Sequence, residues 1–461
     1  MATRRSVASV ITIGFVLICA SLRAETQEGP RFVGTAFTAC LGGREFLISR
    51  DGRMLSEVGY DEIADTFMGT GDPVLPIRQN GKWGYISITG KRVAECKYDS
   101  AREFVFDLTT AKRDGKWWIL NQSGEEVKPL EGEYSYVASL PWGDFVGFGP
   151  NWEFRGLFSS DGALRMAGNN YERVTPMSRT RIRVQAAGKY GVVEPPDRVV
   201  IPIEYDNLIP NPRIVIAVKD HETTILDPNG RHVFNGSFDS ASLAGKDLLL
   251  LELGNRYSLC DFLGNVLATD LEKLITTVYL WQPNVEAFPA KKDGFWGFLG
   301  FDGKWLIEPK YLGVSNWAGG AGMVEDPVNP GIWVLVTKGG SRLLSLPRKT
   351  WIRSTHGEAG WLLSGASLRS VVLVSPAGDA SRTYDEVGLI RYGYASVRKG
   401  KLWGVISPKG LEVAPAKYET AYALVPGIIA FTANGLVGLL DEEGKVLCEP
   451  KFERIREIKL E

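Results

Sequence analysis

Residues 81–99 read GKWGYISITGKRVAECKYD, and this stretch decides the fold. Asn80-Gly81 precedes it, Gly90 lies in its middle, and it ends on Tyr98-Asp99. Gly and Asn tolerate the positive backbone angles that tight hairpin turns require. The residues between these points alternate in polarity, as half-buried strands do. The stretch therefore predicts strands joined by tight turns, with no helical period.

The same arrangement recurs along the chain in a fixed phase. An aromatic-Gly pair stands six residues before a turn position at Trp83-Gly84, Tyr190-Gly191, Trp296-Gly297 and Trp403-Gly404. The turn positions, roughly 32 to 39 residues apart, are Gly52, Gly90, Gly124, Gly162, Asp197, Gly230, Gly264, Gly303, Gly340, Gly378, Gly410 and Gly444. Periods of this length are typical of repeat proteins. We expect an all-β fold of about twelve three-stranded β-meander repeats, each of about 35 residues, over residues 31–461.

These residues resemble a known family. The pattern Gly-Lys-Trp-Gly-Tyr-Ile, then a turn Gly, then Tyr-Asp, is similar to the WG-repeat proteins of bacteria. The likeness is sharp at 81–86, 294–299 and 400–406, and weak at 220–274 and 331–386. Trp118 stands where the third unit should have Gly, so the backbone there should differ. The resemblance implies an all-β repeat protein, commonly exported, and supplies no catalytic residue.

Each unit must stack on its neighbours, because a small meander cannot bury both faces alone. We expect the recurrent Trp to fill the interface between units, and its partner Gly to let a strand or ring approach closely. Such units can close into propeller-like rings of blades or continue as an open β-solenoid or superhelix. Twelve blades exceed the usual size of one ring, so two sub-assemblies meeting near residues 235–285 are one possibility.

The first 24 residues have the form of a cleaved signal peptide. Arg4 and Arg5 precede an apolar run over residues 7–22, and the small Ala24 follows. The sequence thus predicts a periplasmic or secreted protein with no integral membrane span after cleavage. Cleavage leaves Cys40, Cys96, Cys260 and Cys448, which could pair in an oxidising compartment but are more simply read as buried thiols.

The charge and the histidines exclude several function classes. The chain has 53 Lys and Arg against 54 Asp and Glu, so it offers no positive excess for binding nucleic acid. Its three histidines, His221, His232 and His356, are not at metal-ligand spacing with one another or with Cys. We therefore expect no metal, no cofactor and no nucleic-acid partner.

The carboxylate side chains allow one alternative function, that of an enzyme. A carbohydrate-active enzyme on a propeller, such as a glycoside hydrolase or lyase, would use two acids facing each other. However, Asp99, Asp206, Asp239, Asp385 and Glu419 recur at one position of the repeat, which favours a structural role such as capping a turn. The non-repeating acids are Asp144, Asp247 and Asp326, and the sequence singles out none of them.

Tryptophans outside the repeat position are the candidate binding residues. They are Trp142, Trp152, Trp281, Trp317 and Trp351, on or near connections between strands. Aromatic faces stack on sugars and attract cations, and loops are where binding residues concentrate. Packing in the core is the alternative role for each. The favoured hypothesis is an exported, non-catalytic repeat protein that presents a binding or scaffolding surface to a protein or glycan partner.

Overall fold

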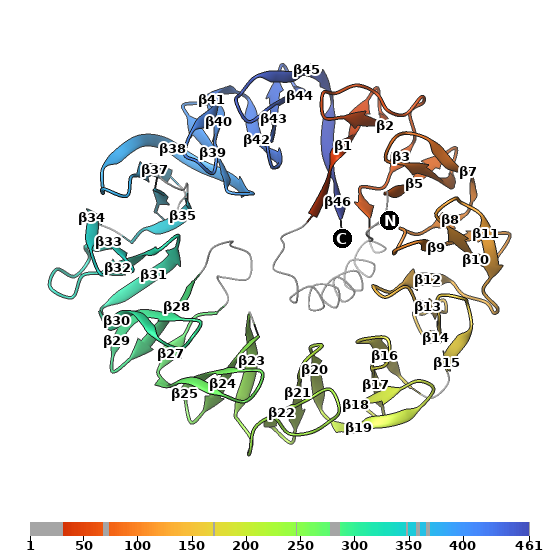
Figure 1. The fold of residues 1–461 in the computed structure, drawn as a ribbon, viewed down its shortest axis with the longest axis horizontal. Helices are drawn as coiled ribbons and strands as arrows, with labels where there is room; N and C mark the ends of the chain where they lie inside the picture. Colours follow the sequence, from red (N-terminus) through yellow and green to blue (C-terminus); the bar gives the residue numbers. More distant parts are fainter. Residues whose placement is uncertain are drawn as a thin grey trace.

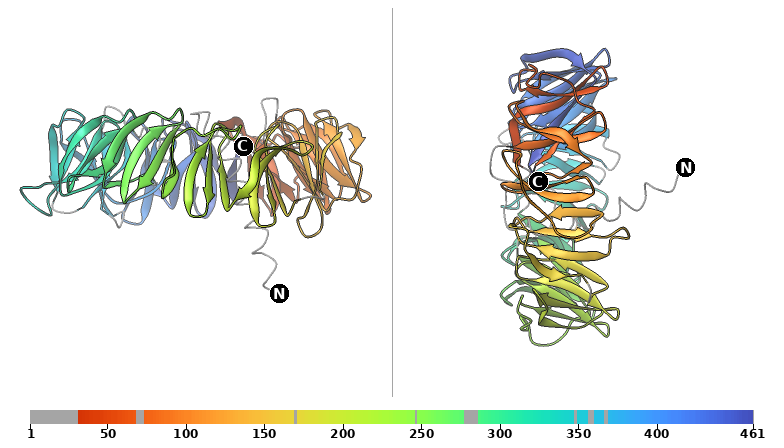
Figure 2. Two further views of the ribbon diagram at one scale, coloured as in Figure 1. Left: turned by 90° about the horizontal axis from the view of Figure 1, so that it is seen from below. Right: turned by 90° about the vertical axis from the view of Figure 1, so that its right-hand side faces the viewer.

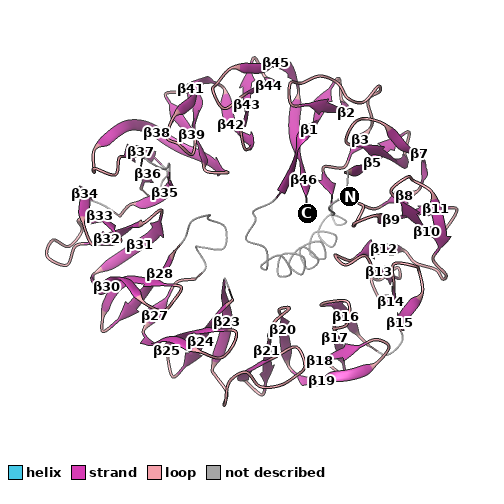
Figure 3. Cartoon of the chain, viewed as in Figure 1, coloured by secondary structure: helices cyan, strands magenta, loops and turns pink. Residues whose placement is uncertain are grey.

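The computed structural model describes residues 31–67, 73–168, 171–245, 247–276, 286–346, 349–355, 360–365 and 369–460. Within these residues every regular element is a β-strand, and none is a helix (Figure 3). Accordingly, no described helix is long and apolar enough to cross a membrane. The all-β prediction is confirmed, whereas the expected signal peptide and Trp281 lie outside the described residues.

The strands follow one another in chain order. The first group is β1 (Arg31–Leu41), β2 (Arg44–Ser49), β3 (Glu62–Ile63), β4 (Thr66–Phe67), β5 (Val74–Gln79), β6 (Lys82–Ser87), β7 (Arg92–Tyr98), β8 (Ser100–Ala101), β9 (Leu108–Arg113), β10 (Lys116–Asn121), β11 (Glu126–Pro129) and β12 (Tyr136–Ser139). Next come β13 (Phe145–Phe148), β14 (Phe154–Phe158), β15 (Leu164–Ala167), β16 (Arg173–Pro176), β17 (Ile182–Ala186), β18 (Lys189–Glu194), β19 (Arg198–Tyr205), β20 (Asn207–Pro210), β21 (Val215–Lys219), β22 (Glu222–Leu226) and β23 (Ser240–Gly245). Then follow β24 (Leu248–Leu253), β25 (Arg256–Asp261), β26 (Val266–Leu271), β27 (Lys273–Leu274), β28 (Ala287–Lys292), β29 (Phe295–Gly300), β30 (Trp305–Tyr311), β31 (Gly313–Ala318), β32 (Ala321–Glu325), β33 (Trp333–Thr337) and β34 (Arg342–Leu346). The last group is β35 (Trp351–Thr355), β36 (Trp361–Ser364), β37 (Arg369–Val374), β38 (Ala380–Arg391), β39 (Tyr394–Lys399), β40 (Leu402–Ile406), β41 (Glu412–Tyr418), β42 (Thr420–Val425), β43 (Ile428–Ala433), β44 (Leu436–Leu440), β45 (Val446–Phe452) and β46 (Arg454–Leu460).

These strands form eleven sheets, which we name A to K in chain order. Sheet A is β2-β1-β46-β4, sheet B is β3-β5-β6-β7, sheets C, D and E hold β8–β11, β12–β15 and β16–β19, and sheet F holds β20–β22. Sheets G, H and I hold β23–β26, β27–β30 and β31–β34, sheet J has seven strands, β35–β41, and sheet K holds β42–β45. Figure 1 shows the sheets arranged around a centre, and the side views of Figure 2 show a single layer of them.

Most sheets have four strands, not the three we predicted per unit. The additional strand is the innermost one, which starts directly after the aromatic-acid pair and can be as short as β8 or β27 (Figure 1). Segments of two residues, such as β8 and β27, are too short to show an alternating pattern, whereas other innermost strands, such as β42, have six residues. We call the strands of a sheet first to fourth, from the centre outward.

Antiparallel pairing assigns the connections to two faces of the layer. Turns between first and second strands, and between third and fourth strands, lie on one face, which we call face 1. Turns between second and third strands, and the links from one sheet to the next, lie on the opposite face, which we call face 2. The fourth strands carry the recurrent Pro residues, as in β19 and β41, at the outer edge where a missing N–H donor is tolerated.

The Gly of each aromatic-Gly pair supports a bulge in the fourth strand. A Cβ on Gly404 would lie 2.4 Å from the carbonyl oxygen of Ala414, and one on Gly297 would lie 2.4 Å from that of Ile307. At this point the register between β40 and β41 shifts, so that the fourth strand bends against the third. The predicted close approach is confirmed. In sheet C, where Trp118 replaces Gly, this residue pairs directly with Pro129.

Hydrophobic clusters join each sheet to the next. In the third strand of sheet H, Trp296 and Phe298 belong to a cluster shared with sheet I, whereas Leu299 belongs to one shared with sheet G. Trp403 likewise packs toward sheet K. The repeat tryptophans therefore lie at the seams as predicted, but they are half-buried, and the fully buried residue is the one two positions later. The burial of apolar side chains in these seams is the main stabilising term for such units.

The seams continue through the part of the chain where we considered a boundary. One cluster joins sheets F and G through Ile225 and Leu249, and another joins sheets G and H through Leu259 and Phe288. The described residues between 235 and 276 thus belong to sheets that pack on both of their neighbours. All four cysteines beyond the expected signal are free thiols, with Cys260 and Cys448 buried.

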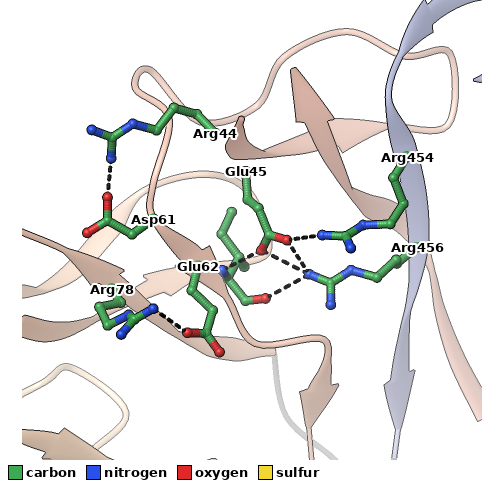
Figure 4. Close-up of polar contacts among 8 residues, drawn as sticks. Arg44, Glu45, Asp61, Glu62, Arg78, Arg454 and Arg456 are labelled. Atoms are coloured by element: carbon green, nitrogen blue, oxygen red, sulfur yellow. Dashed lines mark hydrogen bonds and ion pairs between the residues drawn. The ribbon is translucent and has the colours of Figure 1, made fainter. Parts of the chain in front are cut away.

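Strands from both ends of the described chain meet in sheet A. β46 pairs antiparallel with β1, with Thr38 opposite Arg456 and Cys40 opposite Arg454, and a cluster joins sheet K to sheet A. Figure 4 shows the polar contacts beside this junction, with Glu45 between sheets A and B. The largely buried Glu45 carboxylate accepts hydrogen bonds from Arg454 (2.8 Å), Arg456 (2.7 Å) and the backbone N–H of Ile63 (2.8 Å). A buried carboxylate with this many donors is well compensated.

Candidate binding site

The recurrent acids cap turns on face 2. Glu419 accepts hydrogen bonds from the backbone N–H groups of Asn434 and Gly435, both at 3.0 Å. Asp206 accepts one from Asp220 (2.8 Å), Asp239 one from Gly254 (2.7 Å) and Asp385 one from Gly400 (2.6 Å). The predicted structural role of these carboxylates is confirmed, and they are committed to the turn between the second and third strands.

Neighbouring lysines and turn N–H groups stabilise the ionised form of these caps. The hydrogen bond from Lys82 lowers the pKa of Asp99, and the hydrogen bonds from Lys189 and then from the N–H of Asp220 lower the pKa of Asp206. A carboxylate held in this way is a poor proton donor at neutral pH.

The three non-repeating acids are each paired with arginine. Asp144 is fully buried and lies 2.5 Å from Arg165 and 3.7 Å from Arg179. Asp326 is almost fully buried and lies 2.5 Å from Arg342, while Asp247 lies 2.5 Å from Arg213.

Ion pairing favours the charged form of Asp326. The pKa of Asp326 is lowered, first by Arg342 and then by the N–H of Val328. The described residues contain no group of three or more His, Cys, Asp or Glu side chains placed to hold a metal ion. The contacts of these acids give no support to the acid-base pair that a glycoside hydrolase requires.

One shallow cavity of about 520 Å³ lies on face 1 at the junction of sheets A and K. Its acidic lining includes Asp51 and Asp441. The hydroxyl of Ser49 lowers the pKa of Asp51, and Asp441 accepts hydrogen bonds from the N–H groups of its own turn, at Glu443 and Lys445. None of the candidate tryptophans lines this cavity, and these two acids are used by the turns that carry them.

The structure separates the candidate tryptophans. Trp317 has no exposed surface and lies 5.0 Å from the ring of Phe298 in the seam between sheets H and I, so the expectation of a surface role for Trp317 is wrong. Trp142 is half-buried and donates its indole N–H to Asp144 at 3.2 Å. Trp351 is half-buried, with the cations of Lys349 and Arg353 over its ring at 5.2 and 5.4 Å. These tryptophans lie in different sheets and do not form one site.

Trp152 is the candidate that offers an open ring. It is 38% exposed and lies in the turn between β13 and β14, on face 2 of sheet D. The N–H of Gly149 donates to the carbonyl of Glu153 (2.9 Å), and the N–H of Trp152 donates back to the carbonyl of Gly149 (3.1 Å). The φ angle of Trp152 is +63°. Gly is the usual residue at such a position, and a bulky side chain there is an outlier that costs about 1–3 kcal/mol.

An aromatic group supports the exposed indole. The ring of Trp152 lies 4.9 Å from that of Tyr136 and 5.9 Å from that of Phe148. The guanidinium of Arg102 also lies over the ring of Tyr136, with its Cζ 3.8 Å from the ring centre. Tyr136 is the first residue of the innermost strand, β12. Burial raises the pKa of Tyr136, so its hydroxyl stays protonated at neutral pH. We call Arg102, Tyr136, Phe148 and Trp152 the sheet D platform.

Sequence reasoning missed Arg102 and Tyr136. A signal was present, because the residue before Tyr136 is Ser135, where other units have a capping acid, and Glu153, three residues before Gly156, stands where most units have the turn Gly. In this turn Glu153 accepts the hydrogen bond from the N–H of Asn151 at 2.8 Å, so a local carboxylate replaces the distant cap. Both the capping acid and the turn glycine of the repeat are therefore replaced in sheet D, which indicates that this turn does not depend on them for its structure.

Comparison with known proteins agrees with the pattern of the repeat. The family described as WG containing repeat matches residues 83–117 and 381–403. The chain contains WG-type repeats. The two matches cover the pairs Trp83-Gly84 and, at its Trp, Trp403-Gly404, and they support a WG-repeat family. No curated protein matches the chain.

Solved structures with similar strand arrangements share little sequence with this chain. A eukaryotic initiation factor is 9% identical with a TM-score of 0.35, over 84% of this chain and 97% of that one. Hsv2 of Kluyveromyces marxianus is 9% identical with a TM-score of 0.28, over 53% and 95%. PorZ of Porphyromonas gingivalis, a surface component of the type-IX secretion system, is 10% identical with a TM-score of 0.21, over 79% and 76%. At these scores the likeness supports no inference about this chain.

Proposed function

We propose that this chain is an exported, non-catalytic WG-repeat protein, related to those of bacteria, which presents a binding or scaffolding surface to a protein or glycan partner. The amino-terminal pattern at residues 1–24 supports a cleaved signal and a periplasmic or secreted location. The observation that carries the binding role is Trp152, an exposed indole on a residue with a strained, positive φ. A surface residue that costs stability without filling a seam is typical of a functional position.

We further propose that the sheets form one closed propeller of about twelve blades, in preference to an open solenoid. Sheet J counts as two blades, because the long strand β38 ends one meander and starts the next, and a separate cluster packs its two halves together. The pairing of β46 with β1 and the cluster between sheets K and A support closure. A closed ring holds many turns on one rigid face, which suits contacts spread over several sheets.

A Trp152→Gly variant tests the binding role directly. Gly accepts the positive φ of this position without strain, so the turn should persist while the stacking surface is lost. The variant and the native protein are used as bait for the native envelope fraction and on a glycan array. Asn255→Gly, at a positive φ in the corresponding turn of sheet G, is the matched control.

Loss of the captured partner or glycan in Trp152→Gly, with capture intact in Asn255→Gly, is the expected result. Equal capture by all three proteins would remove the sheet D platform from the proposal. Comparable melting temperatures of the two variants and the native protein show that the fold is intact in each.

A further inference from the structure

Arginines stacked on aromatic rings usually have a polar partner in this protein. Arg78, 5.6 Å over Trp83, pairs with Glu62 at 3.0 Å. Arg398, 5.9 Å over Trp403, pairs with Glu386 at 2.6 Å. Further examples are Arg113, which lies over Trp118 and pairs with Glu126, and Arg183, which lies over Tyr190 and donates to the side-chain oxygen of Asn207. A stacked guanidinium thus normally has an ion-pair or hydrogen-bond partner within the chain, even where its Nε is buried without one, as in Arg78 and Arg183.

Arg102 is the exception. Its guanidinium lies 3.8 Å from the ring centre of Tyr136 and 5.7 Å from that of Trp117, and its Nε is buried and donates no hydrogen bond. No carboxylate in the described ranges forms an ion pair with it. Its backbone is held firmly, since its carbonyl accepts hydrogen bonds from Tyr85 (3.0 Å) and Thr109 (2.7 Å). The half-buried side chain therefore holds a fixed, uncompensated positive charge between two rings.

The charge and the exposed indole belong to the same platform. Tyr136 contacts both Arg102, which directly follows the innermost strand β8, and Trp152, which lies in a turn on face 2. The strands β8 and β12 lie in neighbouring sheets (Figure 1). A guanidinium binds a carboxylate through two parallel hydrogen bonds, and an indole face binds the apolar face of a pyranose ring. One chemical unit, a pyranose that bears a carboxylate, supplies both groups.

We infer that the partner of the sheet D platform is an acidic glycan built from uronic acid residues. The sugar ring stacks on Trp152, its carboxylate binds the guanidinium of Arg102, and Tyr136 holds both groups in place. An acidic peptide would satisfy Arg102 but would leave the flat indole without a matching surface. The inference rests on the proposed binding function and adds to it the class of ligand.

Polygalacturonate and its fully methyl-esterified form provide a matched pair of probes, because esterification removes the charge of each carboxyl group, adding only a methyl group, and leaves the sugar rings unchanged. Binding of both is measured by isothermal titration with the native protein and with Arg102→Gln, Trp152→Gly and Asn255→Gly. Polyglutamate serves as the acidic peptide probe. The comparison of the two glycans on the native protein needs no variant to fold.

The native protein should bind polygalacturonate roughly tenfold or more tightly than the ester. Arg102→Gln should remove that preference and leave the weak binding of the ester unchanged, whereas Trp152→Gly should weaken both by roughly tenfold or more. Asn255→Gly should behave as the native protein does.

Equal binding of the two glycans would overturn the acidic ligand while leaving a glycan-binding function in place. Binding of polyglutamate without polygalacturonate would overturn the glycan in favour of an acidic peptide. Binding of none of the probes would overturn this inference, and the envelope capture experiment would then decide the broader binding function separately.

Discussion

Sheets K and D build the same turn in different ways. In sheet K, Gly435 occupies the left-handed position at φ +74°, and Glu419 of the preceding link caps it. In sheet D the turn is longer, from Gly149 to Glu153, its left-handed residue is Trp152 at φ +63°, and Ser135 replaces the acid. Where the repeat pattern is kept, the turn glycine and the capping acid both stabilise the fold. Where the glycine and the acid are both replaced, a side chain of the turn becomes available to a partner.

The largest difference between the two kinds of unit should come from the glycine of the aromatic-Gly pair. A Cβ on Gly404 would lie 2.4 Å from a backbone oxygen, whereas one on Gly156 in sheet D would meet side-chain atoms of Phe158 at 2.9 Å and Leu164 at 3.0 Å. Side chains can move aside more easily than a bulged strand. We expect Gly404→Ala to destabilise the protein by about 3 kcal/mol and Gly156→Ala by about 1 kcal/mol.

Urea unfolding of the two alanine variants measures this difference. Equal losses of unfolding free energy would mean that the bulge in sheet J does not require glycine more than sheet D does. The proposed difference between regular and irregular units would then be wrong.

The cap should have a smaller effect. Glu419→Ala removes the acceptor for two turn N–H groups, which are left to water, and we expect a loss of about 1 kcal/mol. Ser135→Ala, at the corresponding position of sheet D, should change the unfolding free energy by less than about 0.5 kcal/mol, since its side chain caps no turn. A cost at Ser135 as large as that at Glu419 would contradict the exchange of roles proposed for sheet D.

Low pH should destabilise the turns that are capped by carboxylates. The pKa of Asp206 is lowered in the folded protein by Lys189 and by the N–H of Asp220, so its contribution to stability is present above the unfolded pKa of about 3.9. That contribution is lost as the pH falls through the lower, folded pKa. We expect the melting temperature of Asp206→Asn to depend less on pH below about pH 4 than that of the native protein. Parallel melting curves for the two proteins across this range would refute the role of the ionised cap.

Trp152→Gly should have a small net effect on stability. Relief of the positive φ strain and loss of contact with Tyr136 and Phe148 act in opposite directions, each by about 1–2 kcal/mol. We therefore expect a net change within about 1 kcal/mol in unfolding free energy, together with loss of ligand capture. A large destabilisation would show instead that Trp152 is a packing residue like Trp317.

The sequence predicted those parts of the fold that depend on local rules. The Trp403-Gly404 spacing, the turn at Gly410 and the acid at Glu419 are set by contacts within one unit, so their pattern repeats and can be read. The two-residue strand β8 has no such pattern, and it forms because β9 offers it an edge. The number of strands in each sheet was therefore underestimated.

The candidate site depends on contacts between neighbouring sheets, which no local sequence pattern shows. Trp152 and Trp317 both lie outside the repeat phase, yet one projects from a turn and the other fills a seam, because the identity of the neighbouring sheet decides burial. Arg102 belongs to sheet C and reaches Tyr136 of sheet D, so only the packing of two units brings them together. The missing acid at Ser135 and the altered turn beside it were the local signs of this position.

Because β46 pairs with β1, sheet A cannot be completed until β46 has been synthesised. Sheet A receives β1, β2 and β4 early in translation, but β46, which lies between β1 and β4, comes only after the strands of every other sheet have been made. Until then the amino-terminal hairpin has an open hydrogen-bonding edge, and the seam facing sheet K has no cover. A chaperone that shields unpaired strand edges would be needed most by this hairpin, and a nascent chain stalled before Arg454 would expose it for as long as the stall persists.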